Sequence, residues 1–264
     1  MTVERSGACC AVESAWLSVC IDSSQGGNIT LAKLLPQNIP VLTTNYHSTD
    51  AYILIDGIGG FYSTGDPSAE LAVLEQSPGC AMIETRASLV SRPGNPAEPS
   101  RVGATVRRYT IWDDLPVIRV DTRIEVDAAL AGPGWRSSDA RLVDMEANYD
   151  ELDHFAYPGS EGAVVTGPLD HAMNGKTETL GEPWYCLFGK RLSLTVRLDD
   201  PAKYCFYWAE NALVNMGALN IHGVAFLAQW SYGTRTVGPA DVPLCGTFWA
   251  GFGEEPRPLA FPCR

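Results

Sequence analysis

Residues 116–127 read PVIRVDTRIEVD, and this stretch decides the fold. The even-numbered positions from 118 to 126 carry Ile, Val, Thr, Ile and Val, whereas the odd-numbered positions from 119 to 125 carry Arg, Asp, Arg and Glu. A repeat of two residues gathers all the charges on one side of a β-strand, whereas a helix would scatter them around its circumference. The stretch therefore predicts a strand with one face in the core and the other in water.

The same alternation recurs along the chain. Residues 191–198 (RLSLTVRL) predict a second half-exposed strand. Weaker strand patterns cover residues 15–22, 51–56, 81–90, 102–112, 203–209 and 224–231. Helix signals are confined to residues 68–76, which follow an Asp-Pro pair, and to residues 211–220. So many strands with so little helix predict an all-β fold, a large antiparallel β-sandwich with few short helices. Because no linker interrupts the pattern, we expect a single domain over residues 1–264.

Composition limits the partners of the chain. It has 264 residues, with 19 Lys or Arg against 31 Asp or Glu and a net charge of −12. This charge opposes binding to nucleic acid or to an anionic membrane, so we expect neither partner. A small-molecule or glycan ligand is favoured, and a homo-oligomer is compatible with the sequence. No signal peptide is visible, which predicts a cytoplasmic protein, although a secreted mature form would look the same.

The motifs of metal and cofactor sites are missing from the sequence. None of the eight cysteines forms a C-x2-C pair, so we expect no metal site. Residues 57–60 (GIGG) do not match the dinucleotide-binding fingerprint and open no helix pattern, so we expect no cofactor. Cys20, Cys186 and Cys205 lie in apolar strand patterns, and we expect reduced, buried thiols there.

Two stretches interrupt the strand rhythm. Residues 91–101, rich in Pro, Gly and Ser, predict a long hairpin loop, and residues 147–179 are polar with little strand character. A segment of about thirty such residues inside a compact domain is usually a functional loop or a lid. His154 and His171 lie in it, each next to an aspartate, although neighbours on a strand point to opposite faces. We predict them as acid/base residues, the alternative for each being a hydrogen-bonded structural histidine.

The last third of the chain is rich in aromatic residues. Trp208 and Trp230 are candidates for a flat platform under the apolar face of a sugar, the alternative being core packing. Glu210 follows Trp208 closely, and a carboxylate desolvated by indole surface suits a general acid, whereas an exposed glutamate would have no such role. The remaining predicted ligand-binding residues are His47, Tyr157, His222 and Arg235.

One family resemblance adds to these patterns. The run Leu17–Asp22, followed by Gly26-Gly27 and residues 28–31, resembles the start of galactose-mutarotase-like β-supersandwich domains. The hairpin over residues 109–120 is similar to their long paired strands. The resemblance covers the first half of the chain and implies a supersandwich fold with a carbohydrate held on a concave sheet face.

The resemblance is less close at the catalytic residues. Sugar 1-epimerases of that superfamily use a histidine acid and a glutamate base. Their Asn-rich histidine motif is not reproduced around His154 or His171, and the surroundings of Glu254 do not match those of the base. This departure argues against plain mutarotase activity.

Together these observations favour a cofactor-independent acid/base enzyme acting on a carbohydrate or a similar polyhydroxylated or cyclic small molecule. The reaction would be an isomerisation, a lyase reaction or a hydrolysis. His154 and His171 would move protons with Glu210 as their partner, while Arg235 orients the substrate. One alternative is a non-catalytic glycan-binding β-sandwich module, and another is a natural-product cyclase with an apolar β cavity. Clustering of the histidines with Glu210 would favour catalysis, since proton transfer needs direct or water-bridged reach.

Overall fold

The computed structural model describes residues 1–42, 49–91, 96–137, 139–145, 151–159, 161–168, 177–178, 182, 184–199, 204–210, 223–229 and 236–253. At residues 139, 141–145, 177–178, 198, 204–210 and 223–229 the description is limited to the backbone.

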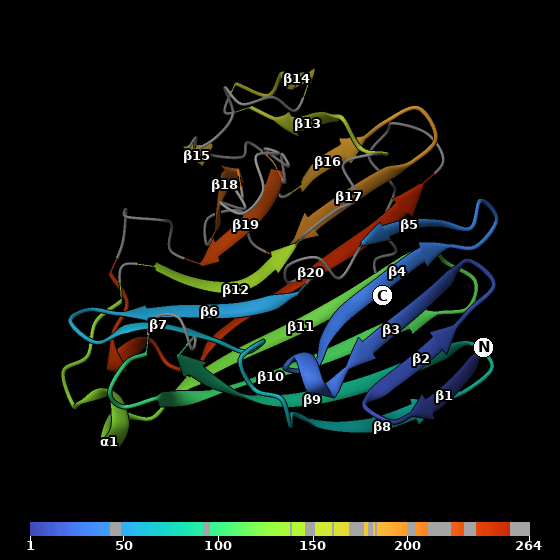
Figure 1. Ribbon diagram of the computed structural model, residues 1–264. Coiled ribbons are helices and arrows are strands. Elements are labelled where there is room, and N and C mark those ends of the chain that lie inside the picture. The colour runs from blue at the N-terminus through green and yellow to red at the C-terminus, as the bar shows by residue number, and fades with distance from the viewer. Residues whose placement is uncertain are drawn as a thin grey trace, which may run out of the picture.

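The first sheet is small and follows the order of the chain. Its five antiparallel strands pair in the order β1 (Thr2–Ser6), β2 (Cys9–Glu13), β3 (Leu17–Asp22), β4 (Asn28–Leu34) and β5 (Ile39–Leu42). The burial of β3 alternates strictly, with Leu17, Val19 and Ile21 in the core. In Figure 1 this small sheet lies in front of the long strands of the second sheet.

The second sheet holds the other strands of the described residues. Its order is β14-β13-β16-β17-β20-β11-β10-β9-β7-β6-β12-β19-β18-β15, and β8 pairs with β9 beside this path. The bounds are β6 (Asp50–Ile55), β7 (Gly59–Tyr62), β8 (Glu70–Gln76), β9 (Cys80–Ser91), β10 (Arg101–Trp112), β11 (Val117–Val126), β12 (Asp139–Met145), β13 (His154–Pro158), β14 (Val164–Pro168), β15 (Thr177–Glu178), β16 (Trp184–Phe188), β17 (Ser193–Leu198), β18 (Tyr204–Glu210), β19 (Gly223–Gln229) and β20 (Leu244–Gly253). Helix is limited to α1 (Ala128–Ala131) and the 3-10 turns η1 (Ser23–Gln25) and η4 (Pro239–Asp241) among the residues that these ranges cover.

The stretch that decided the fold forms β11 as predicted. Ile118, Val120 and Ile124 are fully buried, whereas Arg123 is exposed. The strand pairs with β10 on one side and β20 on the other. The weaker patterns also form strands, namely β3, β6, β9, β10, β18 and β19. The all-β antiparallel sandwich is therefore confirmed.

The helix predicted over residues 68–76 is wrong, because this segment is the edge strand β8. Before it, the Asp66 carboxylate accepts hydrogen bonds from the backbone N–H groups of Ser68 (3.0 Å) and Ser88 (2.6 Å). This acidic group, which precedes the predicted helix, instead closes a turn onto β9, and Glu70 then pairs with Arg86. The other predicted helix, residues 211–220, lies outside the described residues.

Two expectations about β17 and its surroundings also need correction. β17 is a strand, but Ser193 and Thr195 on its predicted solvent face are fully buried, so the strand is not half-exposed. Small hydroxyl side chains fit a covered face as well as a wet one, and alternation alone does not separate the two cases. The segment 147–179 contains the strands β13, β14 and β15, so its predicted lack of strand character is wrong as well. The predicted loop between residues 91 and 101 does separate β9 from β10.

Among the cysteines whose side chains the structure describes, two form a disulfide and four are thiols. Cys9 and Cys20 form a disulfide between β2 and β3, with their Cα atoms 6.1 Å apart, so the prediction of a buried free thiol at Cys20 is wrong. The physical reason is that Cys20 lies on the outward face of β3, between the buried Val19 and Ile21. Cys186 is a buried free thiol as predicted, whereas the side chain of Cys205 is not described.

A buried polar network joins the two sheets. Arg107 of β10 is fully buried and donates to the carbonyl of Gly26 (3.2 Å) and to Ser63. Tyr109 donates to the carbonyl of Gly27 (2.9 Å), and the Thr85 hydroxyl reaches the same oxygen (3.2 Å). The glycine turn after β3 is therefore the point where the small sheet docks on the large one.

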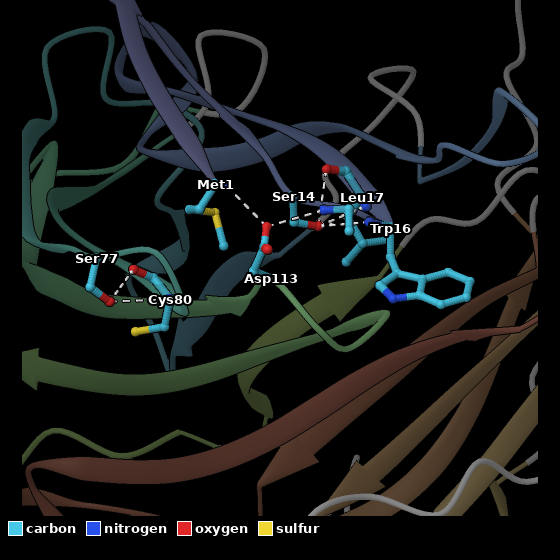
Figure 2. Close-up of polar contacts among 8 residues, drawn as sticks. Met1, Ser14, Trp16, Leu17, Ser77, Cys80 and Asp113 are labelled. Carbon is cyan, nitrogen blue, oxygen red and sulfur yellow. Dashed lines mark hydrogen bonds and ion pairs between the residues drawn. The ribbon is translucent and has the colours of Figure 1, made fainter.

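A second contact lies at the far end of the sandwich. Figure 2 shows Asp113, in the turn after β10, beside the turn that joins β2 to β3. Its Oδ1 atom accepts from the backbone N–H of Ala15 (3.2 Å) and lies 3.0 Å from the amino group of Met1. The Ser14 hydroxyl accepts from the N–H of Leu17 (2.9 Å) and closes that turn. The small sheet is thus held to the long strands at both of its ends.

Candidate functional site

The strands β8 to β11 and β20 present one face away from the small sheet. Arg107 and Tyr109 point toward the glycine turn of the small sheet, so Val106 and Arg108 point the other way. Residues paired across neighbouring strands share a face, which extends this assignment to β9, β11, β17 and β20. We call it the outer face.

A groove of about 620 Å³ is hollowed in the outer face. Its lining comes from strands far apart in the sequence and includes Glu84, Arg108, Asp121, Arg123, Cys245 and Thr247. The volume lies within the range of small-molecule and cofactor sites, about 300 to 1,000 Å³. We call this feature the outer groove.

The side chains of the outer groove stand in two rows that cross the strands. The first row begins at Asp199, directly after the end of β17, and runs over β20, β11, β10 and β9 with Thr247, Asp121, Arg108 and Glu84. The second row runs over β20, β11, β10, β9 and β8 and consists of Cys245, Arg123, Val106, Arg86 and Glu70. Each row arises because the alternation of every strand is in register with that of its neighbours.

Ion pairs balance the charges of the outer groove. Arg108 Nη2 lies 2.9 Å from Glu84 Oε2, and Arg86 Nη2 lies 2.9 Å from Glu125 Oε2. Arg123 also pairs with Glu125, from its place next but one along β11. Exposed pairs of this kind add little stability, about 0 to 1 kcal/mol each. The pairs matter more for binding, since they present hydrogen-bond donors and acceptors to a ligand without a large net charge.

Asp121 is held in place by hydrogen bonds from two neighbouring strands of the outer groove. Its Oδ1 accepts from the Thr247 hydroxyl at 2.6 Å and from Arg119 at 2.9 Å (Nη2) and 3.2 Å (Nε). All of these contacts go to one oxygen, so Oδ2 is the atom that a ligand hydroxyl can approach. A carboxylate fixed in this way is pre-organised for binding.

A tryptophan stands on the outer face one row beyond the groove. Trp249 of β20 pairs with Arg119 of β11 and with Arg197 of β17. The Arg119 guanidinium carbon lies 5.7 Å from the centroid of its ring, within cation–π distance. Arg119 therefore links the ring to Asp121 in the groove.

His154 lies on the outer face but not in the outer groove. It pairs with Phe188 of β16, and Phe188 pairs with Ser193 of β17. Ser193 is six residues from Asp199 along the chain, which corresponds to about 20 Å of strand. The two rings of His154 and Phe188 stack with centroids 5.5 Å apart.

The aspartate before His154 does pair with it. His154 Nδ1 lies 2.7 Å from Asp153 Oδ1, although adjacent strand residues were expected to diverge. They do not diverge because Asp153 precedes the first residue of β13. The hydrogen bond with His154 lowers the pKa of Asp153 below its usual value, against a smaller opposite effect of burial. Both side chains are largely exposed.

The other predicted site residues are only in part within the described structure. Tyr157 is 6% exposed, belongs to the hydrophobic core and stacks on Phe155 with centroids 5.9 Å apart. Trp208 and Glu210 lie on β18, where only the backbone is described. The predicted residues outside the described ranges are His47, His171, His222, Trp230 and Arg235. The predicted clustering of the histidines with Glu210 therefore stays a prediction.

Sequence reasoning missed the residues of the outer groove, although it had found one of its strands. Arg119, Asp121 and Arg123 were predicted to face water but were given no role. The missing signal was the register between strands, which sets Thr247 opposite Asp121. Alternation in Leu244–Gly253 could have placed Trp249 on the same face as Thr247.

Within the described residues, no group of three or more His, Cys, Asp and Glu side chains could hold a metal ion. No helix in these ranges has the length and hydropathy that a membrane span needs.

Comparison with known proteins shows the fold. No protein-family model matches the chain, and no curated protein matches it. A galactose mutarotase-like protein from Clostridium acetobutylicum is similar over 96% of this chain and 98% of its own, with 10% identity and a TM-score of 0.57. An alpha-mannosidase from Enterococcus faecalis is similar over 93% of this chain, with 10% identity and a TM-score of 0.60. An alpha-N-acetylgalactosaminidase from Bifidobacterium bifidum is similar over 92% of it, with 9% identity and a TM-score of 0.55.

The chain spans only part of the two glycosidases, 29% of the mannosidase and 36% of the acetylgalactosaminidase. It matches nearly the whole of the mutarotase-like protein. The chain thus has the galactose-mutarotase-like β-supersandwich fold.

Proposed function

We propose that this chain binds a neutral carbohydrate in the outer groove. The observation that carries the proposal is the lining of the groove, where arginines and carboxylates are paired with each other across the strands. Sugar hydroxyls both donate and accept hydrogen bonds, so they match a surface that offers donors and acceptors without a large net charge. The similar structures are a mutarotase-like protein and two glycosidases, which supports a carbohydrate ligand.

Asp121 is the central ligand-binding residue of this proposal. With Oδ1 held by Thr247 and Arg119, its Oδ2 accepts from a sugar hydroxyl. Trp249 lies one row away from the polar groove. Its apolar ring can serve as a platform for the apolar face of a sugar.

The test is calorimetric titration with galactose, mannose, N-acetylgalactosamine and their linear oligomers. The proposal expects binding by the wild type and a loss of about tenfold or more in Asp121→Asn, because a hydrogen bond to a charged acceptor contributes about 1.5 to 3 kcal/mol. Glu13→Gln, an exposed carboxylate of the small sheet, is the matched control and should bind as the wild type does. Binding that Asp121→Asn leaves unchanged would place the ligand elsewhere.

A second candidate function is acid/base catalysis at His154, with His171 and Glu210 as predicted from the sequence. The observation that favours it is the Asp153–His154 pair, because a carboxylate fixes the orientation and tautomer of the imidazole and leaves Nε2 for a substrate. The reaction would be an isomerisation, a lyase reaction or a hydrolysis. The cyclase alternative receives no support from the outer groove, which is open and polar.

Polarimetry and a reducing-end assay on the sugars that bind test the second candidate. We expect His154→Gln to abolish turnover, whereas Asp121→Asn, about 20 Å away along the strands, should leave turnover unchanged. Full turnover by His154→Gln would leave His154 as a structural histidine, whereas no turnover by the wild type would favour the non-catalytic glycan-binding module.

A further inference from the structure

We infer that the outer groove takes a linear oligosaccharide of about four sugar units that lies across the strands, not a single sugar. The inference rests on the proposed carbohydrate function and names the size and direction of the ligand.

The first support is the length of the two rows. Each row crosses five strands, from β17 to β9 or from β20 to β8. Neighbouring strands are about 4.8 Å apart, so each row spans about 19 Å. A pyranose ring in an extended glycan advances by about one such spacing, so a single ring would leave most of both rows without a ligand.

The second support is the repetition of the chemistry along the rows. Carboxylates stand at Asp199, Asp121 and Glu84 in the first row, on every second strand. Arg108 fills the strand between the last two carboxylates, and Thr247 fills the strand between the first two. An acceptor therefore recurs at regular spacing, as a ligand with repeating units requires.

The third support is the way the second row ends. Glu70 is exposed and belongs to β8, which pairs only with β9 among the described strands. The groove thus reaches the edge of this part of the sheet, so a longer glycan can continue beyond it. A closed end would have fitted a monosaccharide better.

The experiment is calorimetric titration with linear oligosaccharides of one to six units, built from mannose, galactose, glucose, xylose or N-acetylglucosamine. For the series that binds, affinity should rise by about tenfold or more from one unit to four and then level off, as a few added hydrogen bonds predict. Equal affinity for one and four units, with binding still lost in Asp121→Asn, would overturn this inference and leave the proposed function intact. Binding by no member of any series would overturn both.

Two variants of β8 test whether the glycan runs across the strands. Glu70→Gln changes the end of the second row, whereas Glu75→Gln changes an exposed carboxylate of the same strand that does not line the groove. Glu70→Gln should weaken tetrasaccharide binding by about threefold or more and disaccharide binding by less, since a disaccharide can sit further along the rows. If Glu70→Gln weakens the tetrasaccharide no more than Glu75→Gln does, the glycan does not run across the strands.

Discussion

Gly26 tests how the two sheets are joined, and alanine at this position should lower the free energy of unfolding by about 2 to 5 kcal/mol. The backbone there has φ +68°, a left-handed conformation that costs a non-glycine residue about 1 to 2 kcal/mol. A Cβ atom would lie 2.0 Å from the carbonyl oxygen of Ser63 and 2.8 Å from the backbone nitrogen of Thr64. Backbone atoms cannot rotate away, so overpacking adds about 1 to 3 kcal/mol.

Two other glycines separate these contributions. Gly57 has φ +79° with nothing within 4 Å of an added Cβ, so Gly57→Ala should show the backbone cost alone, about 1 to 2 kcal/mol. Gly134 has neither a left-handed backbone nor a close neighbour, and Gly134→Ala should stay within about 0.5 kcal/mol of the wild type.

Urea denaturation of the three variants is the assay, with equal slopes as the sign that only stability has changed. If Gly26→Ala costs no more than Gly57→Ala, the glycine turn is not pressed against Ser63. The docking of the small sheet described above would then be wrong.

Protonation, thiol chemistry and ligand binding give three further tests. Burial acts to raise the pKa of Asp66, but hydrogen bonds from the backbone N–H groups and the hydroxyls of Ser68 and Ser88 outweigh it and lower the pKa. Its carboxylate therefore stabilises the fold above the unfolded pKa of about 3.9, and this is lost as pH falls through the lower folded value. The difference in unfolding free energy between wild type and Asp66→Asn should shrink from about pH 6 to about pH 3, and a constant difference would refute the assignment. Burial raises the pKa of Cys186 to about 11, so an aromatic disulfide reagent at pH 8 should leave this thiol unmodified while it labels the exposed Cys245; comparable rates would contradict the burial. Thr247→Val removes the hydroxyl that donates to Asp121 and should weaken glycan binding by about three- to tenfold, and an unchanged affinity would remove Thr247 from the site.

The sequence predicts the strands whose two faces differ in chemistry. β11 is the clearest case, because Ile118 and Val120 face the core while Arg123 faces water. The pattern fails where both faces are covered, as at Ser193 of β17, or where both are exposed, as along β8. Along β8 the local sequence favours a helix, but pairing with β9 decides the conformation.

The candidate site was harder to predict because it depends on register. Asp121 and Thr247 are 126 positions apart in the sequence and become neighbours only when β11 pairs with β20. The histidines were predicted as site residues because imidazole titrates near neutral pH. This property belongs to the residue type and does not indicate where in the fold a histidine lies. His154 shares the outer face with the groove, but the register of β13, β16 and β17 sets it about 20 Å away along the strands.

A glycan in the outer groove would cover Cys245, so the rate of Cys245 alkylation reports whether the groove is occupied. Cys245 is an exposed thiol that lines the groove, so it reports occupancy without a new probe. A tetrasaccharide at about five times its wild-type dissociation constant should slow the reaction of Cys245 with a maleimide severalfold in the wild type and less than about twofold in Asp121→Asn. A glycan that binds the wild type without slowing the reaction would contradict the proposal that the glycan lies in the outer groove.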